Sequence, residues 1–263
     1  MKRARTALLF SLLAAGGLHG QTGMPPALRD VGIDQNLDAP LPADLHFVDA
    51  DGRPVRLGDF LGKRPVVLAL VYYDCPMLCG LVLNGLLKSL RAIRLEVGTD
   101  FDVVVCSIDP AEKPPLAASK RSVYLKAYGR PRSAAGWHFL TGDAESIERL
   151  ASAVGFRYRY DPATRQFAHA SGIMVATPAG KLARYLYGIE YSARDLRLAL
   201  VEAAAGRIGT AADRVLLFCY HYDPKTGRYG VAILRVIRVL GSATVLALAC
   251  WIAVMVGRER SRS

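Results

Sequence analysis

The sequence predicts an α/β fold with a mixed central sheet flanked by helices. Apolar, β-branched runs of strand length alternate with amphipathic stretches of helix length, as in the crossover units that build parallel strands. The last part of this region instead contains two strand patterns joined by a short turn, followed by one more helix. A chain of 263 residues with 52% hydrophobic content can bury such a core. Among α/β folds, the thioredoxin-like class fits this order of elements best.

The elements are expected in the following order. A β-hairpin is expected at 45–57, because apolar and polar residues alternate on both sides of the turn signal Asp51-Gly52. Periodicity and turn signals then predict alternating strands and helices: a strand at 66–73, a helix at 78–96, a strand at 101–108 and a helix at 115–128. A short strand at 137–140, a helix at 143–154 and a short extended piece at 156–160 are expected next. The region ends with a second hairpin, at 173–177 and 182–187, and a last helix at 192–205.

Both ends of the chain carry targeting patterns. Three basic residues, an apolar run and small residues up to Gly20 have the order of a secretory signal peptide, predicted at 1–20; an uncleaved anchor is the alternative. The mostly apolar stretch 231–257 predicts a transmembrane helix, with a core helix as the alternative, and the basic tail 258–263 is expected in the cytoplasm. The domain is therefore expected on the extracytoplasmic (periplasmic) side of the cytoplasmic membrane, held by one C-terminal helix.

Three further segments complete the expected organisation. Residues 21–44 are rich in Pro, Asp and Gly and predict an irregular arm. The thioredoxin-like domain is expected at 45–206, and a juxtamembrane segment at 207–230 connects it to the membrane helix. The formal net charge of +11 suits acidic partners or anionic lipid headgroups. No arginine-rich run interleaved with aromatic residues is present, which argues against nucleic acid as a partner.

The most informative motif is Cys75-Pro-Met-Leu-Cys79, which lies between a predicted buried strand and a predicted amphipathic helix. The start of a helix favours thiolate over thiol, because its free N–H groups and its dipole stabilise negative charge. Residues four apart on a helical turn share one face. Both sulfurs could therefore reach one metal ion or each other.

Three chemistries compete for this motif. A dithiol redox centre usually has two residues between its cysteines, whereas three are present here. A thioredoxin also has a cis-proline before the strand that faces the cysteines, but the equivalent stretch 167–174 contains His169 and no proline. A metal site formed by Cys75, Cys79 and His169 would be a soft three-ligand set that favours copper, Cu(I) or Cu(II), since zinc usually takes a fourth ligand. A purely structural disulfide is the third possibility.

The chain resembles the Sco/SenC/PrrC family in five motifs, distributed over about 44–205: the Cys-Pro-x-x-Cys motif after a hydrophobic strand, Ser107-Ile-Asp-Pro110, Leu140-Thr-Gly142, Phe167-Ala-His169 and Thr177-Pro-Ala-Gly180. The resemblance implies a membrane-attached, thioredoxin-fold, copper-binding protein that helps to assemble the CuA centre of cytochrome c oxidase. It also implies that Cys75, Cys79 and His169 match the family's copper ligands. Two departures are Gly80, where the family usually has proline, and the C-terminal position of the predicted anchor.

The function expected from these observations is a membrane-tethered copper chaperone rather than an enzyme. Its implied partner is cytochrome c oxidase subunit II or another copper or dithiol protein. The main alternative is an extracytoplasmic thiol-disulfide oxidoreductase, with Cys75 and Cys79 as its redox-active pair, that reduces partner cysteines without stable copper binding. A thiol peroxidase and a copper-responsive signalling protein are further alternatives.

Other cysteine, histidine and acidic residues each allow a functional or a structural interpretation. Cys219 and His221 are two apart, so on a strand they would share one face and could form a second copper site; an extended segment packed on the domain explains them equally well. Cys106 is expected to be an inert core residue, and Cys250 a small apolar residue of the membrane segment. Asp74 either opposes thiolate formation or faces solvent in a turn.

Overall fold

The computed structural model describes residues 30–74 and 78–208, and beyond them 222–223, 228–229, 241–242, 244, 248 and 251. The predicted signal peptide at 1–20 and most of the predicted membrane helix at 231–257 lie outside the described residues. Among the residues that are described, no helix is long and apolar enough to span a bilayer. The two predicted targeting segments therefore stay predictions.

A seven-stranded mixed sheet forms the centre of the domain, in the order β10-β9-β4-β5-β6-β2-β3. The three central strands β4, β5 and β6 are parallel, and every other pair in this sheet is antiparallel. The strands are β2 (His46–Asp49), β3 (Pro54–Arg56), β4 (Val66–Val71), β5 (Asp102–Ser107), β6 (Trp137–Thr141), β9 (Gly172–Ala176) and β10 (Leu182–Tyr187). The mixed sheet confirms the predicted α/β class, and the antiparallel pair β2–β3 lies within the stretch 45–57 expected to form a hairpin.

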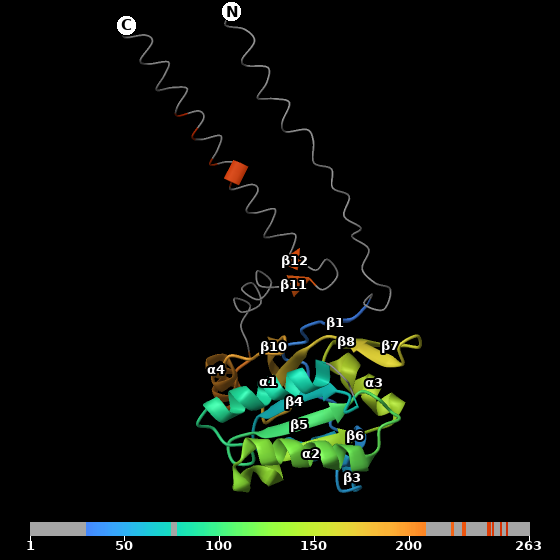
Figure 1. The fold of residues 1–263 in the computed structure, drawn as a ribbon. Coiled ribbons are helices and arrows are strands. Elements are labelled where there is room, and N and C mark those ends of the chain that lie inside the picture. The colour runs from blue at the N-terminus through green and yellow to red at the C-terminus, as the bar shows by residue number, and fades with distance from the viewer. Residues whose placement is uncertain are drawn as a thin grey trace, which may run out of the picture.

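The strands β4 and β5 are buried along their whole length. The strand β4 is wholly apolar, and β5 is apolar from Val103 to Cys106 between Asp102 and Ser107; neither shows polar alternation, as is typical of strands covered on both faces. Four helices cover or flank the sheet: α1 (Leu78–Ala92), α2 (Pro114–Tyr128), α3 (Ala144–Ala153) and α4 (Ala193–Ala204). Figure 1 shows α1 and α2 in front of the strands of the main sheet, with α4 beside α1. Two short 3₁₀ helices, η3 (Leu57–Phe60) and η4 (Pro131–Gly136), complete the connections.

The helix predicted at 78–96 ends at Ala92, four residues earlier than expected. The guanidinium of Arg130 donates to the carbonyl oxygens of Ile93 (2.9 Å) and Leu95 (3.0 Å), which satisfies backbone acceptors beyond the last helical turn. Ile93 and Val97 are still buried in the turn that follows. Their apolar spacing continues the helical pattern in the sequence although the backbone has left the helix.

A second sheet of three strands lies beside the main one, in the order β1-β7-β8. Its strands are β1 (Gly32–Ile33), β7 (Phe156–Asp161) and β8 (Gln166–His169), and both pairs are antiparallel. The strand β1 lies within the stretch 21–44 expected to be an irregular arm, and its residues Gly32 and Ile33 pair with the edge of β7. A two-residue strand is too short for periodicity to reveal it. His169 belongs to this second sheet, as the last residue of β8. A separate antiparallel pair joins β11 (Tyr222–Asp223) to β12 (Arg228–Tyr229).

Candidate metal centre

The cysteine motif lies at the carboxyl end of β4, the edge of a parallel sheet where sites usually form. The chain leaves β4 at Val71, passes through Tyr72, Tyr73 and Asp74, and enters α1 at Leu78. Cys75 and Met77 lie outside the described residues. The backbone of Cys79 is in the first turn of α1, as the sequence predicts, and its side chain is not described.

His169 is the last residue of β8, opposite Tyr158 on β7, and only 6% of it is exposed. Its Nδ1 lies 2.8 Å from the carbonyl oxygen of Ala170. A carbonyl oxygen only accepts, so Nδ1 carries the proton and Nε2 carries the lone pair that a metal ion requires. Burial lowers the pKa of His169 below its ordinary value, partly offset by the bond to Ala170. The neutral imidazole is the form that binds metals.

Aromatic contacts connect His169 to the segment that precedes the cysteines. The ring of Tyr72 meets the His169 ring edge-on, with centroids 6.0 Å apart. The ring of Phe156 is tilted against the His169 ring, with centroids 5.9 Å apart. Phe167 contacts Tyr72 as well, at 5.6 Å. The predicted imidazole ligand therefore lies against Tyr72, which is three residues before Cys75 in the sequence.

Glu112 is a residue of this region that the sequence does not single out. It follows β5, is 7% exposed, and its carboxylate accepts hydrogen bonds from the backbone N–H groups of Tyr73 (2.9 Å) and Asp74 (2.7 Å). The hydroxyl of Ser107 donates to the same carboxylate. Burial raises the pKa of Glu112, and these three hydrogen bonds oppose the rise. No local pattern reveals the role of Glu112, because the two backbone N–H groups that it accepts from are about forty residues away in the sequence. Asp74 itself is exposed, as expected of a turn residue.

The remaining predicted site residues are placed as follows. Cys106 is buried in β5 as a free thiol, and burial raises its pKa, which confirms the prediction of a core residue. Cys219, His221 and Cys250 lie outside the described residues. Among the side chains that are described, no group of three His, Cys, Asp or Glu residues could hold a metal ion. The two predicted sulfur ligands are not among the described side chains, so the ligand set Cys75, Cys79 and His169 remains a prediction.

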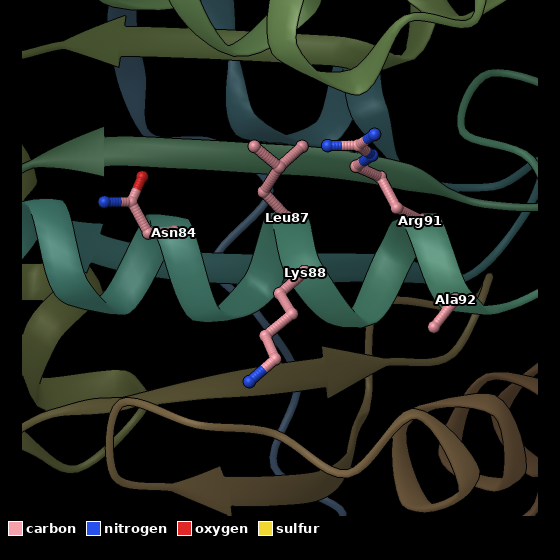
Figure 2. Close-up of a pocket in the computed structure, with 5 residues that line it drawn as sticks. All are labelled: Asn84, Leu87, Lys88, Arg91 and Ala92. Atoms are coloured by element: carbon pink, nitrogen blue, oxygen red, sulfur yellow. The ribbon is translucent and has the colours of Figure 1, made fainter.

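A pocket of about 560 Å³ lies along α1, lined by Asn84, Leu87, Lys88, Arg91 and Ala92. Figure 2 shows these five side chains along α1, from Asn84 to Ala92.

Comparison with known proteins supplies the family. The SCO1/SenC family model matches residues 34–204. A Stutzerimonas stutzeri protein whose name suggests copper binding is 25% identical over 143 residues, which is 52% of this chain and 65% of the relative. The crystal structure of a candidate electron transfer protein from Aquifex aeolicus superposes with a TM-score of 0.58 at 24% identity, covering 67% of this chain and 98% of that one.

The crystal structure of Arabidopsis thaliana ScoI with copper bound also superposes, with a TM-score of 0.50 at 20% identity, covering 62% of this chain and 96% of that one. At these identities the two solved structures show a shared fold. The family model extends over more than half of the chain, from the arm before β2 to the end of α4. This protein belongs to the SCO1/SenC family.

Proposed function

We propose that this protein is a membrane-tethered, extracytoplasmic copper chaperone that assists assembly of the CuA centre of cytochrome c oxidase. One observation carries the proposal: the buried imidazole of His169, whose pKa is lowered by burial, lies against Tyr72, three residues before Cys75. An imidazole with Nδ1 hydrogen-bonded to a backbone carbonyl is oriented to bind a metal through Nε2.

The donor set fits copper as the cargo. Cys75 and Cys79 supply two soft sulfur ligands, which favour Cu(I), and the imidazole of His169 also accepts Cu(II). Cys79 lies in the first turn of α1, where the helix dipole stabilises a thiolate. The name of the Stutzerimonas stutzeri relative and the copper bound to Arabidopsis thaliana ScoI support the same cargo.

Transfer then follows by ligand exchange. The thiolates of a partner, which we propose is subunit II of the oxidase, replace Cys75, Cys79 and His169 one at a time, so that the copper is never released into solution. Reduction of the partner can precede this step: the two thiols of the chaperone give two electrons and two protons to a partner disulfide, and a Cys75–Cys79 disulfide forms. The oxidised chaperone loses its two thiolate ligands and with them its copper site.

The location is part of the proposal. The signal pattern at 1–20 and the apolar stretch at 231–257 would place the domain outside the cytoplasmic membrane. Protease accessibility in intact spheroplasts tests this topology. Digestion of the domain from the outside supports it, and protection of the domain until the cells are lysed contradicts it.

The experiment for the function is the copper content of the full-length protein, purified in detergent under reducing, oxygen-free conditions. About one copper per chain, retained through gel filtration and transferred to an apo-CuA domain, supports the proposal. A protein that binds no copper but reduces disulfides at a catalytic rate is the thiol-disulfide oxidoreductase. This second function is favoured by one feature, the position of Cys79 at a helix start.

A further inference from the structure

The backbone that leads into the cysteine motif is held by one buried carboxylate. Glu112 accepts from the N–H of Tyr73 with Oε2 and from the N–H of Asp74 with Oε1. These are consecutive residues, and Cys75 is the next one in the chain. Hydrogen bonds to an ionised carboxylate are stronger than those between neutral groups. Two of them on adjacent peptide groups fix the direction in which the chain enters the motif.

The side chain of Tyr73 also holds this segment in place. The hydroxyl of Tyr73 lies 2.9 Å from the carbonyl oxygen of Val105 and 2.8 Å from that of Leu140. Those two acceptors belong to β5 and β6, and β5 is the direct neighbour of β4 in the sheet. Tyr73 is therefore anchored to the sheet through its side chain and to Glu112 through its backbone.

Glu112 is itself held by the turn that follows β5. Its N–H donates to the carbonyl oxygen of Asp109, and its carboxylate accepts from the hydroxyl of Ser107. The Ser107 hydroxyl oxygen in turn accepts from the N–H of Asp109 at 3.0 Å. The turn between β5 and α2 is thus a rigid support for the junction between β4 and α1, although the two segments are far apart in the sequence.

We propose that Glu112 is a positioning residue for the copper-binding dithiol: it holds the backbone of Tyr73 and Asp74, which leads directly into Cys75. This inference rests on the proposed copper function. Metal ligands need support within a few tenths of an ångström, and that support comes from hydrogen bonds of the surrounding residues. Here the support acts on the backbone beside Cys75, whereas His169 is oriented separately through Ala170.

The test compares Glu112→Gln with Glu202→Gln in the full-length protein. The Glu112→Gln substitution keeps the shape of the side chain, but it puts an NH₂ group where an oxygen accepted, so one N–H of the junction loses its partner. Glu202 on α4 is the control, because it is also a hydrogen-bonded carboxylate; its side chain is 28% exposed, is paired with Arg184 at 2.8 Å and lies outside the proposed centre. Copper(I) affinity is measured by competition with bicinchoninate, the Cu(II) form by its absorption spectrum, and the folded state by thermal unfolding.

The expected result is a loss of about tenfold or more in Cu(I) affinity and a shifted Cu(II) spectrum for Glu112→Gln at a temperature where the variant is folded. Glu202→Gln is expected to retain wild-type affinity and spectrum. If Glu112→Gln does not fold, Glu112→Asp is used, which keeps the charge but draws back both oxygens, and the same loss is expected. Wild-type affinity and spectrum in a folded Glu112 variant overturn the inference. A wild-type protein that binds no copper overturns the proposed function instead, so the two failures are distinct.

Discussion

The ring of His169 meets the ring of Tyr72 edge-on, with centroids 6.0 Å apart. This contact joins the three-stranded sheet, where His169 ends β8, to the segment between β4 and the cysteine motif. Residues almost a hundred positions apart in the sequence are thereby brought into contact. The consequences below follow from this arrangement and from the packing that supports it.

The first prediction concerns Gly85, in the middle of α1. A Cβ atom at this position would lie 1.8 Å from the backbone oxygen of Ile189, in the loop before α4. The loop must move to accommodate Gly85→Ala, and overpacking of this kind costs about 1–3 kcal/mol of unfolding free energy or more. Urea denaturation of the reduced, copper-free protein measures the loss.

Gly80 in the same helix is the matched control, because no atom of the described residues lies within 4 Å of a Cβ added there. Gly80→Ala should raise the unfolding free energy by about 0.5–1 kcal/mol through helix propensity alone. Equal effects of the two substitutions would show that α1 does not approach the loop at Ile189 as closely as described.

The second prediction concerns the hydroxyl of Tyr73. Tyr73→Phe removes the donor shared by the carbonyl oxygens of Val105 and Leu140, and should lower the unfolding free energy by about 1–2 kcal/mol. Tyr160→Phe is the control, since Tyr160 is 47% exposed, and it should change stability by less than about 0.5 kcal/mol. A Tyr73→Phe variant as stable as the control would mean that the hydroxyl anchor is energetically unimportant.

The third prediction is a pH dependence that His138 imposes on stability. Burial lowers the pKa of His138, and the nearby carboxylate of Asp102 offsets part of the shift. The unfolded chain takes up a proton at His138 below about pH 6.5, while the folded protein resists it. The unfolding free energy therefore falls as the pH drops from about 6.5 towards the lower pKa of the folded state, by at most about 1.4 kcal/mol per pH unit for one proton.

His138→Gln should flatten this part of the stability profile. Burial shifts the pKa of His169 in the same direction, so the difference between His138→Gln and wild type isolates the contribution of His138. An identical slope for His138→Gln and wild type would show that His138 titrates equally in the folded and unfolded states.

The fourth prediction concerns Cys106. This residue is 1% exposed and burial raises the pKa of its thiol, so little thiolate exists to react. Iodoacetamide should leave Cys106 unmodified in the native, reduced protein and modify it after denaturation, as followed by peptide mass spectrometry. Cys106→Ala should bind copper as wild type does. Rapid native labelling at Cys106 would mean that β5 opens under native conditions.

The sequence predicts those helices and strands whose residue pattern follows directly from which side chains are buried. The run 66–71 is entirely apolar because β4 is covered on both faces, and Asp143 and Ser192 each cap the helix that follows, α3 and α4. The strand β8 is not predicted, because Gln166–His169 alternates too little to indicate a strand. Its pairing with β7 depends on the turn at 162–165, where Arg165 adopts a φ of 56°.

Some residues of the candidate site can be predicted from the sequence and others cannot. The cysteine motif is local and visible in the sequence, and His169 is identified from its place before a hairpin and from the family resemblance. Glu112 is not identifiable, because a single carboxylate has no pattern and its contacts to Tyr73 and Asp74 exist only after β4 and β5 have paired. Hydrogen bonds across a sheet edge are a product of the tertiary fold, which periodicity does not encode.

The most direct test of the copper proposal is the copper affinity and Cu(II) spectrum of His169→Ala in the reduced full-length protein, with the exposed His46→Ala as the matched control. The proposal predicts that His169→Ala lowers Cu(I) affinity about tenfold or more and changes the Cu(II) spectrum, that Cys75→Ser and Cys79→Ser each abolish stable binding, and that His46→Ala changes neither property. Wild-type affinity and spectrum in His169→Ala would contradict the three-ligand copper site.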